Sequence, residues 1–341
     1  MTYPFQITLE IQQANQAIEQ AREQIEQLLL PKLQAERLRT QARVHAAYFS
    51  TWLDGSSLSL DEAITVLIDG HKLRGREADV LQLKRMYQAL EQIETWSTQA
   101  AALDEAHIRK LHAVLATGRR AKASLYLPDA QISARMAELV AWLNQPEIEQ
   151  PAPLPVGMLP APLLAGVAHY QINAIQTFSG FNARLGRALA TWVLYRGGYP
   201  LLRSGALEES LAADVPAYHA AAATPDLTIW LSFFCARLAA AYASAALEVS
   251  QLASSSSAPP TTDDSTLPQP DKRAMHVLRL FATQNEITTK DVMRLLGLPP
   301  RQASELLVAW VRKGWLAPAG ARYRLSADFK RNFDQIMQQN S

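Results

Sequence analysis

The sequence has few of the residues from which disulfide frameworks, metal centres and export signals are built. Cys235 is the single cysteine in 341 residues, which excludes an intrachain disulfide and a zinc site made of several cysteines. The net charge is only +1, so the whole-chain balance gives no sign of a polyanionic partner. The first residues lack a basic segment followed by an apolar run, so we expect no signal peptide and a cytoplasmic protein.

A membrane span is also not expected. The most apolar window covers residues 227–249, but Arg237 interrupts it and alanine dominates it. A buried helix accounts for this composition better than a transmembrane helix does. Hydrophobic residues make up 48% of the chain, enough for a substantial core, and the length indicates two or three domains.

Apolar residues recur at three- and four-residue spacing through most of the first 250 residues, which predicts a mainly α-helical fold. Ser59 followed by Glu62 is typical of a capping box at a helix start, and Pro31 predicts a break between two early helices. A Ser-, Thr- and Pro-rich stretch after residue 252 indicates a flexible linker. We therefore divide the chain into an N-terminal helical region (1–98), a helical core (99–250), a linker (251–271) and a C-terminal module (272–341).

The C-terminal module is basic. Residues 272–341 contain twelve Lys and Arg against five Asp and Glu, a net charge of +7, which leaves −6 on residues 1–271. We predict three helices here, over residues 273–284, 288–297 and 299–314. Two strands around an AGA turn then follow. The short GLPP turn between the second and third helices has helix-turn-helix length, and the module resembles the winged-helix family over its whole length.

This resemblance implies double-stranded DNA as the partner of residues 272–341. The early residues of the third helix would face the major groove: Arg301, Gln302, Ser304 and Glu305. Arg301 suits guanine and Gln302 suits adenine, while Arg322 and Arg324 on the wing suit phosphate or the minor groove. A homodimer would be needed for a specific operator. Alternatively, the module mediates dimerisation or docks a protein, and its arginines form a solvated face.

The sequence QTFSGFNARLGR, residues 176–187, joins two helical runs and has the residues of an anion site. We predict Asn182 as the N-cap of a helix that ends at Gly197. Arg184 and Arg187 then share one side of the first turn, next to the free N–H groups of the helix end. That arrangement suits phosphate or carboxylate. The alternative is that both arginines pair with acidic residues of the body.

The same stretch resembles the signature of the Fic family, HPFx(D/E)GNGRxxR. Phe178, Asn182, Arg184 and Arg187 match specified positions, and Gly186 falls on one of the open positions between the two arginines. The flanking helical runs, LHAVLA upstream and PAYHAAAATPDLTIWLSFFCARL downstream also resemble family segments, in the same order. The resemblance covers most of the chain. It implies a Fic-type helical bundle followed by a winged helix-turn-helix domain, which is a familiar addition in this family.

A second segment, STWLDG at residues 50–55, resembles the inhibitory motif (S/T)xxxE(G/N) of the family. Ser50 and Gly55 match, and Asp54 stands where the family has glutamate. In the family that glutamate pairs with the last arginine of the signature, here Arg187, and blocks placement of the ATP γ-phosphate. Because aspartate is shorter by one methylene, the sequence leaves open whether this pairing is made. Without the resemblance, the segment indicates only a helix end with a glycine cap.

The chain departs from the family at the residues that do chemistry. Active members transfer AMP from ATP to a target hydroxyl, with a histidine as general base and an acidic residue holding Mg²⁺. Gln176 occupies the histidine position and cannot accept a proton at neutral pH, while Gly180 occupies the acidic position. Phe181 and Ala183 replace two glycines. The stretch ATGRRAKASLYLP is too short for the strand hairpin that docks the target in active members.

We therefore expect a catalytically degenerate Fic-fold protein with no catalytic residue and no metal ligand. Its body would be regulatory, and would hold ATP or another phosphate-bearing ligand without Mg²⁺ through Asn182, Ala183, Arg184 and Arg187. We expect His169 to be a packed helix residue rather than a substitute base. Two alternatives remain open: an adenylyltransferase with an altered mechanism, and an interaction module that dimerises through the winged helix.

Overall fold

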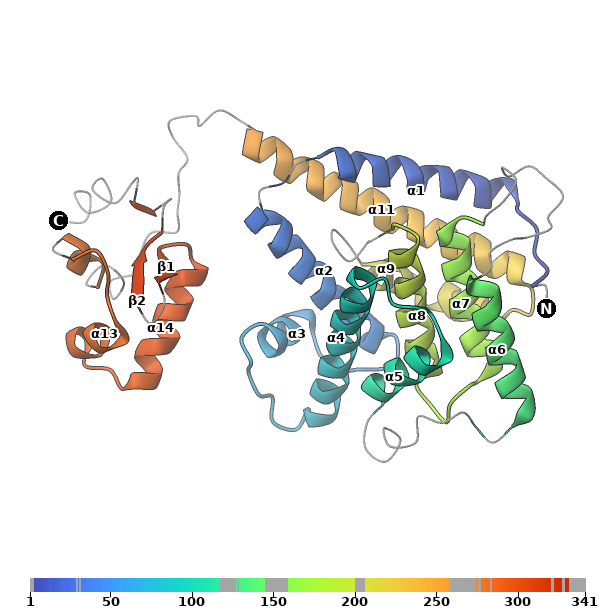
Figure 1. Ribbon diagram of the computed structural model, residues 1–341, viewed down its shortest axis with the longest axis horizontal. Coiled ribbons are helices and arrows are strands. Elements are labelled where there is room, and N and C mark those ends of the chain that lie inside the picture. The colour runs from blue at the N-terminus through green and yellow to red at the C-terminus, as the bar shows by residue number, and fades with distance from the viewer. Residues whose placement is uncertain are drawn as a thin grey trace. The chain divides into compact units, whose positions relative to one another are not determined.

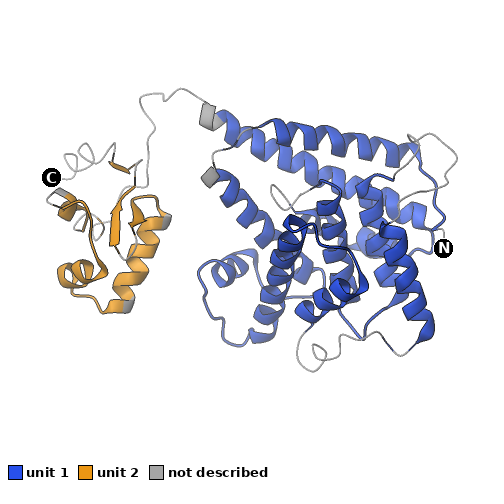
Figure 2. Cartoon of the chain, in the orientation of Figure 1, with its two compact units in different colours: residues 1–257 blue, residues 258–341 orange. Residues whose placement is uncertain are grey.

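The computed structural model separates the chain into two compact units, residues 1–257 and 258–341 (Figure 2). Within the described residues, unit 1 is helical, and unit 2 combines helices with one two-stranded sheet. The residues that the structure describes are 3–28, 30, 32–116, 127, 129–144, 159–199, 206–257, 274, 277–282, 284–319, 322–326 and 329–330.

Unit 1 is a bundle of helices of unequal length (Figure 1). In chain order they are α1 (Leu9–Gln27), α2 (Lys32–Trp52), α3 (Leu60–Leu67), α4 (Glu77–Thr98), α5 (Glu105–Leu115), α6 (Ala130–Asn144), α7 (Ala161–Ile175), α8 (Asn182–Arg196), α9 (Leu207–Ala212), α10 (Val215–Ala223) and α11 (Leu227–Ser257). The predicted break near Pro31 corresponds to the gap between α1 and α2, although Pro31 itself lies outside the described residues.

Helices α7 and α8 form the centre of unit 1. Nearly every residue of α8 from Asn182 to Tyr195 is buried, as expected of a helix that is covered on all sides. Helix α7 packs against α8, α6 and α11, while α2, α4 and α5 contact α8. The sequence that joins α7 to α8 therefore starts and ends in the core, and its position is fixed at both ends.

Gly186 allows α7 and α8 to approach each other closely. A Cβ atom at this position would lie 2.7 Å from His169 Cδ2 and 2.9 Å from the His169 carbonyl oxygen. Real Cβ atoms do not approach backbone oxygens that closely, because protein interiors are already packed at crystal-like density. The glycine is thus a packing requirement of the central helix pair.

Helix α11 contains the apolar window noted in the sequence. Residues Leu227–Ser254 are long and apolar enough to cross a membrane by length and composition alone, with a mean hydropathy of 1.4. The helix packs against α1, α7, α9 and α10, and α1 runs beside it in Figure 1. Contact with these four helices accounts for the apolar character of α11. The helix continues to Ser257, so residues 251–257 of the predicted linker are helical.

The predicted capping box begins α3. Ser59 Oγ accepts a hydrogen bond from the backbone N–H of Glu62 (3.2 Å), and the Glu62 carboxylate accepts one from the Ser59 N–H (2.9 Å). Such reciprocal caps satisfy two backbone donors that the helix itself cannot. The turn between α2 and α3 is thereby fixed from both sides, since Gly55 with φ +90° ends the turn that follows α2.

Unit 2 is a small helical module with a wing (Figure 1). Its described elements are a 3₁₀ helix η3 (Arg279–Ala282), α13 (Thr289–Leu296), α14 (Pro300–Arg312), β1 (Leu316–Ala319) and β2 (Arg322–Leu325). Of the first predicted helix, residues 274, 277 and 278 are α-helical and 279–282 form η3, whereas Gln284 is not helical. Thr288 caps α13, Gly297 closes it with φ +64°, and the antiparallel wing pairs Leu316 with Leu325. Trp310, Trp315 and Phe329 are buried in the core of this module.

Candidate functional site

The loop over residues 176–181 connects the two central helices and has an unusual backbone. Gln176 and Phe181, at its two ends, both adopt the left-handed conformation, with φ of 52° and 62°. This conformation is uncommon outside glycine, and residues persist in it where the surrounding structure fixes them. The loop is therefore held by its neighbours rather than by the preference of its own backbone.

Asn182 closes this loop instead of capping α8. The predicted N-cap is wrong: Phe181 precedes the helix without a side-chain cap, and Asn182 is the first helical residue. The buried Asn182 carboxamide accepts from the Phe178 N–H (3.0 Å) and donates to the Phe178 carbonyl oxygen (2.7 Å). The side chain thus satisfies both backbone groups of a buried residue, whereas as an N-cap it would satisfy one helix donor.

His112 on α5 supports the loop from the other side. Its ring stacks on Phe178 with a centroid distance of 3.8 Å, and its Nε2 lies 3.1 Å from the Gly180 carbonyl oxygen. Burial lowers the pKa of His112, against the opposing hydrogen bond to Gly180. A neutral ring that donates Nε2–H to Gly180 and packs its face on Phe178 therefore fixes the position of the loop.

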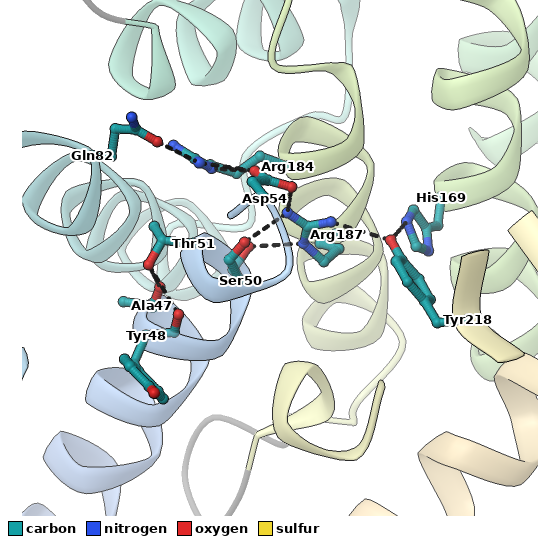
Figure 3. A network of polar contacts seen from close by, with 10 residues as sticks. All are labelled: Ala47, Tyr48, Ser50, Thr51, Asp54, Gln82, His169, Arg184, Arg187 and Tyr218. Atoms are coloured by element: carbon teal, nitrogen blue, oxygen red, sulfur yellow. Dashed lines mark hydrogen bonds and ion pairs between the residues drawn. The ribbon is translucent and has the colours of Figure 1, made fainter. Parts of the chain in front are cut away.

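Arg187 joins α8 to the end of α2 (Figure 3). Its Nε donates to Ser50 Oγ (2.8 Å), and its Nη2 donates to the Ser50 carbonyl oxygen (2.8 Å) and to Asp54 Oδ1 (2.7 Å). Its Nη1 donates to the Tyr218 hydroxyl (3.1 Å). The guanidinium is buried, and these charge-assisted bonds replace the water it has lost.

Arg184 lies on the same side of α8 and shares the same carboxylate. Its Nε donates to Asp54 Oδ2 at 2.8 Å, and its Nη2 donates to Gln82 Oε1 at 2.9 Å (Figure 3). Its Nη1 is buried and has no hydrogen-bond partner. The guanidinium also lies over the Phe181 ring, 5.5 Å from the centroid. The Nη1 donors of Arg184 thus have no acceptor within the described part of the protein.

Asp54 links the two arginines. The sequence left open whether an aspartate reaches Arg187, and the structure brings Ser50, Asp54, Arg184 and Arg187 into direct contact. Burial acts to raise the pKa of Asp54, but Arg187 and Arg184 outweigh it and hold this pKa below its ordinary value. Burial lowers the pKa of Arg184, whereas at Arg187 the charge of Asp54 outweighs burial and raises the pKa. Both guanidiniums stay charged at neutral pH.

Tyr218 extends the cluster to His169. The Tyr218 hydroxyl lies 3.3 Å from His169 Nε2 and accepts from Arg187 on its other side (Figure 3). Burial and the charge of Arg187 lower the pKa of His169 to about 3, so the imidazole is neutral and accepts the Tyr218 proton. The predicted packing of His169 is found, since the residue is fully buried, but it also contacts the arginine cluster through Tyr218.

A cavity of about 400 Å³ opens onto this cluster. It is lined by residues of α7, α8 and α10 and by the turn after α2, including Asp54, Asn173, Gln176, Ala183 and Arg187. Its volume lies within the range of small-molecule sites. A second cavity of about 320 Å³ lies between α2, α9 and α11 and contains the His45–Glu209 pair, but none of the residues that the sequence singled out.

Gln176 borders the cavity with its side chain engaged locally. Its Nε2 donates to the Asn173 carbonyl oxygen (2.6 Å), and its Oε1 lies 3.4 Å from Asn182 Nδ2. Gly180 contributes its carbonyl oxygen to His112. No three His, Cys, Asp or Glu side chains converge into a metal-binding group within the described ranges. The shortened stretch at residues 116–128 lies almost wholly outside those ranges.

The predicted DNA-contacting residues of unit 2 lie on two elements. Gln302 and Glu305 are exposed on α14, and Ser304 is half-buried there. Arg322 and Arg324 are exposed on β2, and Arg322 Nη1 lies 3.5 Å from Glu286 Oε2. The Arg301 side chain lies outside the described residues, although its backbone belongs to α14. The first turns of α14 and the wing therefore both present polar side chains to solvent.

Comparison of the sequence with protein families identifies unit 2. Residues 272–319 match the IclR helix-turn-helix domain family. This match covers η3, α13, α14 and β1, the elements with helix-turn-helix spacing. No curated protein matches the chain.

Solved structures similar to the chain identify the fold of unit 1. A Fic family protein from Desulfovibrio desulfuricans G20 has a TM-score of 0.54 and 20% identity, covering 96% of this chain and 99% of that one. A Fic domain containing signaling protein from Bacteroides thetaiotaomicron VPI-5482 has a TM-score of 0.57 and 21% identity, covering 70% and 97%. Fic-1 from C. elegans, over amino acids 134–508, has a TM-score of 0.55 and 16% identity, covering 71% of each chain.

These similarities establish a mainly helical Fic-type fold that carries a helix-turn-helix domain of the IclR type and a small two-stranded wing. The predicted fold class is confirmed. With identities near 20%, the likeness concerns the fold.

Sequence reasoning missed several partners of the cluster. Gln82, His112 and Tyr218 come from α4, α5 and α10, far from the signature in the chain. His112 had a detectable signal: it belongs to LHAVLA and lies on the apolar face of α5 with Ile108, Leu111 and Leu115. Gln82 had none, since it is a polar residue in an ordinary amphipathic helix. Tyr218 belongs to the segment PAYHAAAA, but nothing in that segment indicated a contact with Arg187.

Proposed function

We propose that this protein is a non-catalytic regulator whose Fic-fold body binds a phosphate-bearing ligand and whose C-terminal winged helix binds double-stranded DNA. Gln176 carries the proposal. It stands where the Fic signature has its histidine, and its carboxamide nitrogen donates to Asn173. A carboxamide cannot act as a general base at neutral pH, and general acid–base catalysis typically contributes about 10²- to 10⁴-fold.

The loop also lacks the ligands needed to bind the Mg²⁺ ion that active Fic proteins use. Mg²⁺ is held in proteins chiefly by carboxylate oxygens. Gly180 supplies none, and its carbonyl oxygen is already bonded to His112. Asp54 is a nearby carboxylate, but each of its oxygens accepts from an arginine. The residues present do not fit this ion, so we propose no step that uses it.

An anion site remains in the same place. Arg184 and Arg187 share the single carboxylate of Asp54, which leaves an excess of positive charge in a buried cluster. Arg184 Nη1 still lacks a partner, and the α8 N-terminus, with Ala183, has no side-chain cap. A phosphate that entered the cavity would compete with Asp54 for both guanidiniums. Asn182 would contribute only its backbone, because its carboxamide is committed to Phe178.

Unit 2 supplies the DNA-binding half of the proposal. It matches a helix-turn-helix domain family and carries a charge of +7 over residues 272–341. Arg322 and Arg324 are exposed on the wing, where basic side chains suit phosphate contacts. A cytoplasmic location and a homodimer that reads two half-sites are part of this proposal.

Calorimetry on the full-length protein tests the proposed binding of a phosphate-bearing ligand by unit 1. We expect ATP or inorganic phosphate to bind equally well with and without Mg²⁺, and to bind Asp54→Ala more tightly than the parent because the competing carboxylate is gone. Phosphate should also raise the Tm of Asp54→Ala more than that of the parent, since a ligand that binds the folded state stabilises it. Glu209→Gln, which removes a surface carboxylate elsewhere in the body, is the matched control and should behave like the parent. Absence of phosphate and nucleotide binding by Asp54→Ala would overturn the anion site.

Fluorescence anisotropy with duplex DNA tests the proposed DNA binding by unit 2. We expect salt-sensitive binding by the full chain and loss of binding on removal of residues 272–341. Unchanged binding after that truncation would refute the assignment of the DNA contact to unit 2. Self-association that ignores salt, without DNA binding, would instead favour a dimerisation module.

A further inference from the structure

Helix α14 has one face in the core of unit 2 and the opposite face in solvent. Ala303, Leu307 and Trp310 are buried in the hydrophobic cluster of the module. Positions 301, 305 and 308 lie on the opposite face, because a separation of seven residues is close to two helical turns. The outward face therefore begins at position 301 and reaches Val308 two turns later.

Val308 is an apolar residue in the middle of this outward face. Its exposed fraction is 44%, while Leu307 and Trp310 beside it are buried. Valine is not a favourable choice for an exposed helix position on propensity grounds, since its branched side chain loses rotamer freedom there. Val308 is not part of the hydrophobic core of the module, so its apolar side chain is available for contact with a bound partner.

The chemistry of the DNA major groove identifies that partner. Among the base edges in the groove, thymine alone presents an apolar group, its C5-methyl. The outward face of the second helix of a helix-turn-helix motif enters this groove. The charge of +7 on residues 272–341 complements the phosphates on both sides of the groove.

We propose that Val308 is a specificity-determining residue that contacts the methyl group of a thymine in the bound half-site. This inference rests on the proposed DNA binding by unit 2. Seven residues of α-helix span about 10 Å, and successive base pairs are about 3.4 Å apart. The thymine therefore lies about three base pairs along the groove from the base that the first turn of α14 meets.

Replacement of thymine by deoxyuridine, which removes only the methyl group, tests this contact. A preferred site is first selected from random duplexes with the full-length protein, and each thymine is then replaced singly. We expect one replacement to weaken binding by the parent about fourfold, the ratio that corresponds to a buried CH₂ group at ~0.8 kcal/mol. Val308→Ala should bind the thymine and deoxyuridine duplexes equally at that position. Alanine favours helix, so the variant should fold, which circular dichroism checks.

Leu295→Ala is the matched control. Leu295 is an exposed apolar residue of the same module, 42% exposed, but it lies on α13. This variant should keep the parent's sensitivity to deoxyuridine. If the parent binds the selected site but no single replacement weakens binding, or if Val308→Ala keeps the sensitivity, the thymine contact is overturned while DNA binding stands. If Val308→Ala disrupts a dimer and leaves base preference unchanged, Val308 is a protein contact and the inference is likewise overturned. Failure to bind any duplex overturns the proposed function itself.

Discussion

Asp54 and Arg187 form a largely buried ion pair in which Oδ1 lies 2.7 Å from Nη2. The same carboxylate uses its other oxygen for Arg184 at 2.8 Å, so one negative charge holds two guanidiniums. The pair joins the turn after α2 to the first turns of α8, two elements more than a hundred residues apart in the chain. Asp54 and Arg187 both line the cavity, so the pair forms part of its wall where the turn after α2 meets α8.

Asp54→Asn should destabilise the protein by about 3 kcal/mol at pH 7, because breaking a buried ion pair leaves uncompensated charge behind. Urea unfolding measures this loss. The pKa of Asp54 lies below its ordinary value, so its stabilisation is present above that value and is lost as the pH falls through the folded-state pKa. The difference between variant and parent should therefore shrink below about pH 4.

Glu209→Gln provides the control for this measurement. Glu209 pairs with His45 at 2.9 Å, but its side chain is about half exposed. Exposed ion pairs contribute less than about 1 kcal/mol. Equal losses in the two variants would show that Asp54 does not hold a buried cluster.

Glu208 should make stability depend on pH in the opposite sense. Its side chain is fully buried on α9, and neither carboxyl oxygen has a hydrogen-bond partner. Burial raises its pKa to about 7, against the opposing charge of Arg187. Because the folded state keeps the proton that the unfolded state releases, stability should fall as the pH rises from about 4.5 to 7.

Glu208→Gln should abolish this decline. The variant should match the parent near pH 4 and exceed it at pH 8 by an amount on the order of 3 kcal/mol. Denaturant unfolding at a series of pH values gives the comparison. Parallel stability curves for the two proteins between pH 5 and pH 8 would contradict the protonated, buried state of Glu208.

Gly186→Ala should destabilise the central helix pair. The added methyl would lie within 3 Å of both the His169 ring and its carbonyl oxygen, and over-packing typically costs about 1 to 3 kcal/mol. This cost outweighs the gain of up to about 1 kcal/mol in helix propensity. Thermal unfolding tests the prediction, with Gly198→Ala as a comparison outside the helix, where no atom lies within 4 Å of the added methyl but φ is +83°. A variant at Gly186 more stable than the parent would refute the close approach of α7 and α8.

Local signals in the sequence predicted the elements well, because caps act over a few residues. Ser59 with Glu62 marks a helix start in the structure, the helix predicted over residues 288–297 is found as α13 between Thr288 and Gly297, and the two wing strands occur around the predicted AGA turn. Asn182 followed the same local rule and was misassigned. Its carboxamide is buried beside Phe178, and two unsatisfied backbone groups of that residue outweigh one helix-end donor.

The partners of the arginines could be predicted only in part. Resemblance to a family motif placed Asp54 near Arg187. The alternative that both arginines pair with acidic residues of the body is found in the structure, but neither motif nor spacing indicated that one carboxylate, Asp54, serves both. Tyr218 reaches Arg187 because α10 packs against the bundle at this place. The local sequence around Tyr218 does not indicate that packing. Contacts between distant helices depend on the assembled core, which single-sequence patterns do not specify.

The wing arginines should account for part of the salt dependence of DNA binding. Arg322→Ala combined with Arg324→Ala should lower the slope of log K against log salt by about 0.9 for each phosphate contact removed. Anisotropy titrations from about 50 to 200 mM salt measure the slope. Arg109→Ala, which removes a partly exposed arginine of α5 paired with Glu105, is the control and should leave the slope unchanged. An unaltered slope in the wing variant would remove the wing from the DNA interface.

The most direct test of the account is label transfer from α-labelled ATP. The full-length protein is incubated with the nucleotide and Mg²⁺, alone and with a cell lysate, and then resolved on a denaturing gel. We expect no label on the protein, and no more label on any lysate protein than in a lysate without the protein, because Gln176 cannot accept the proton of a target hydroxyl. Label that survives denaturation and requires the protein would contradict the central claim and favour an adenylyltransferase with an altered mechanism.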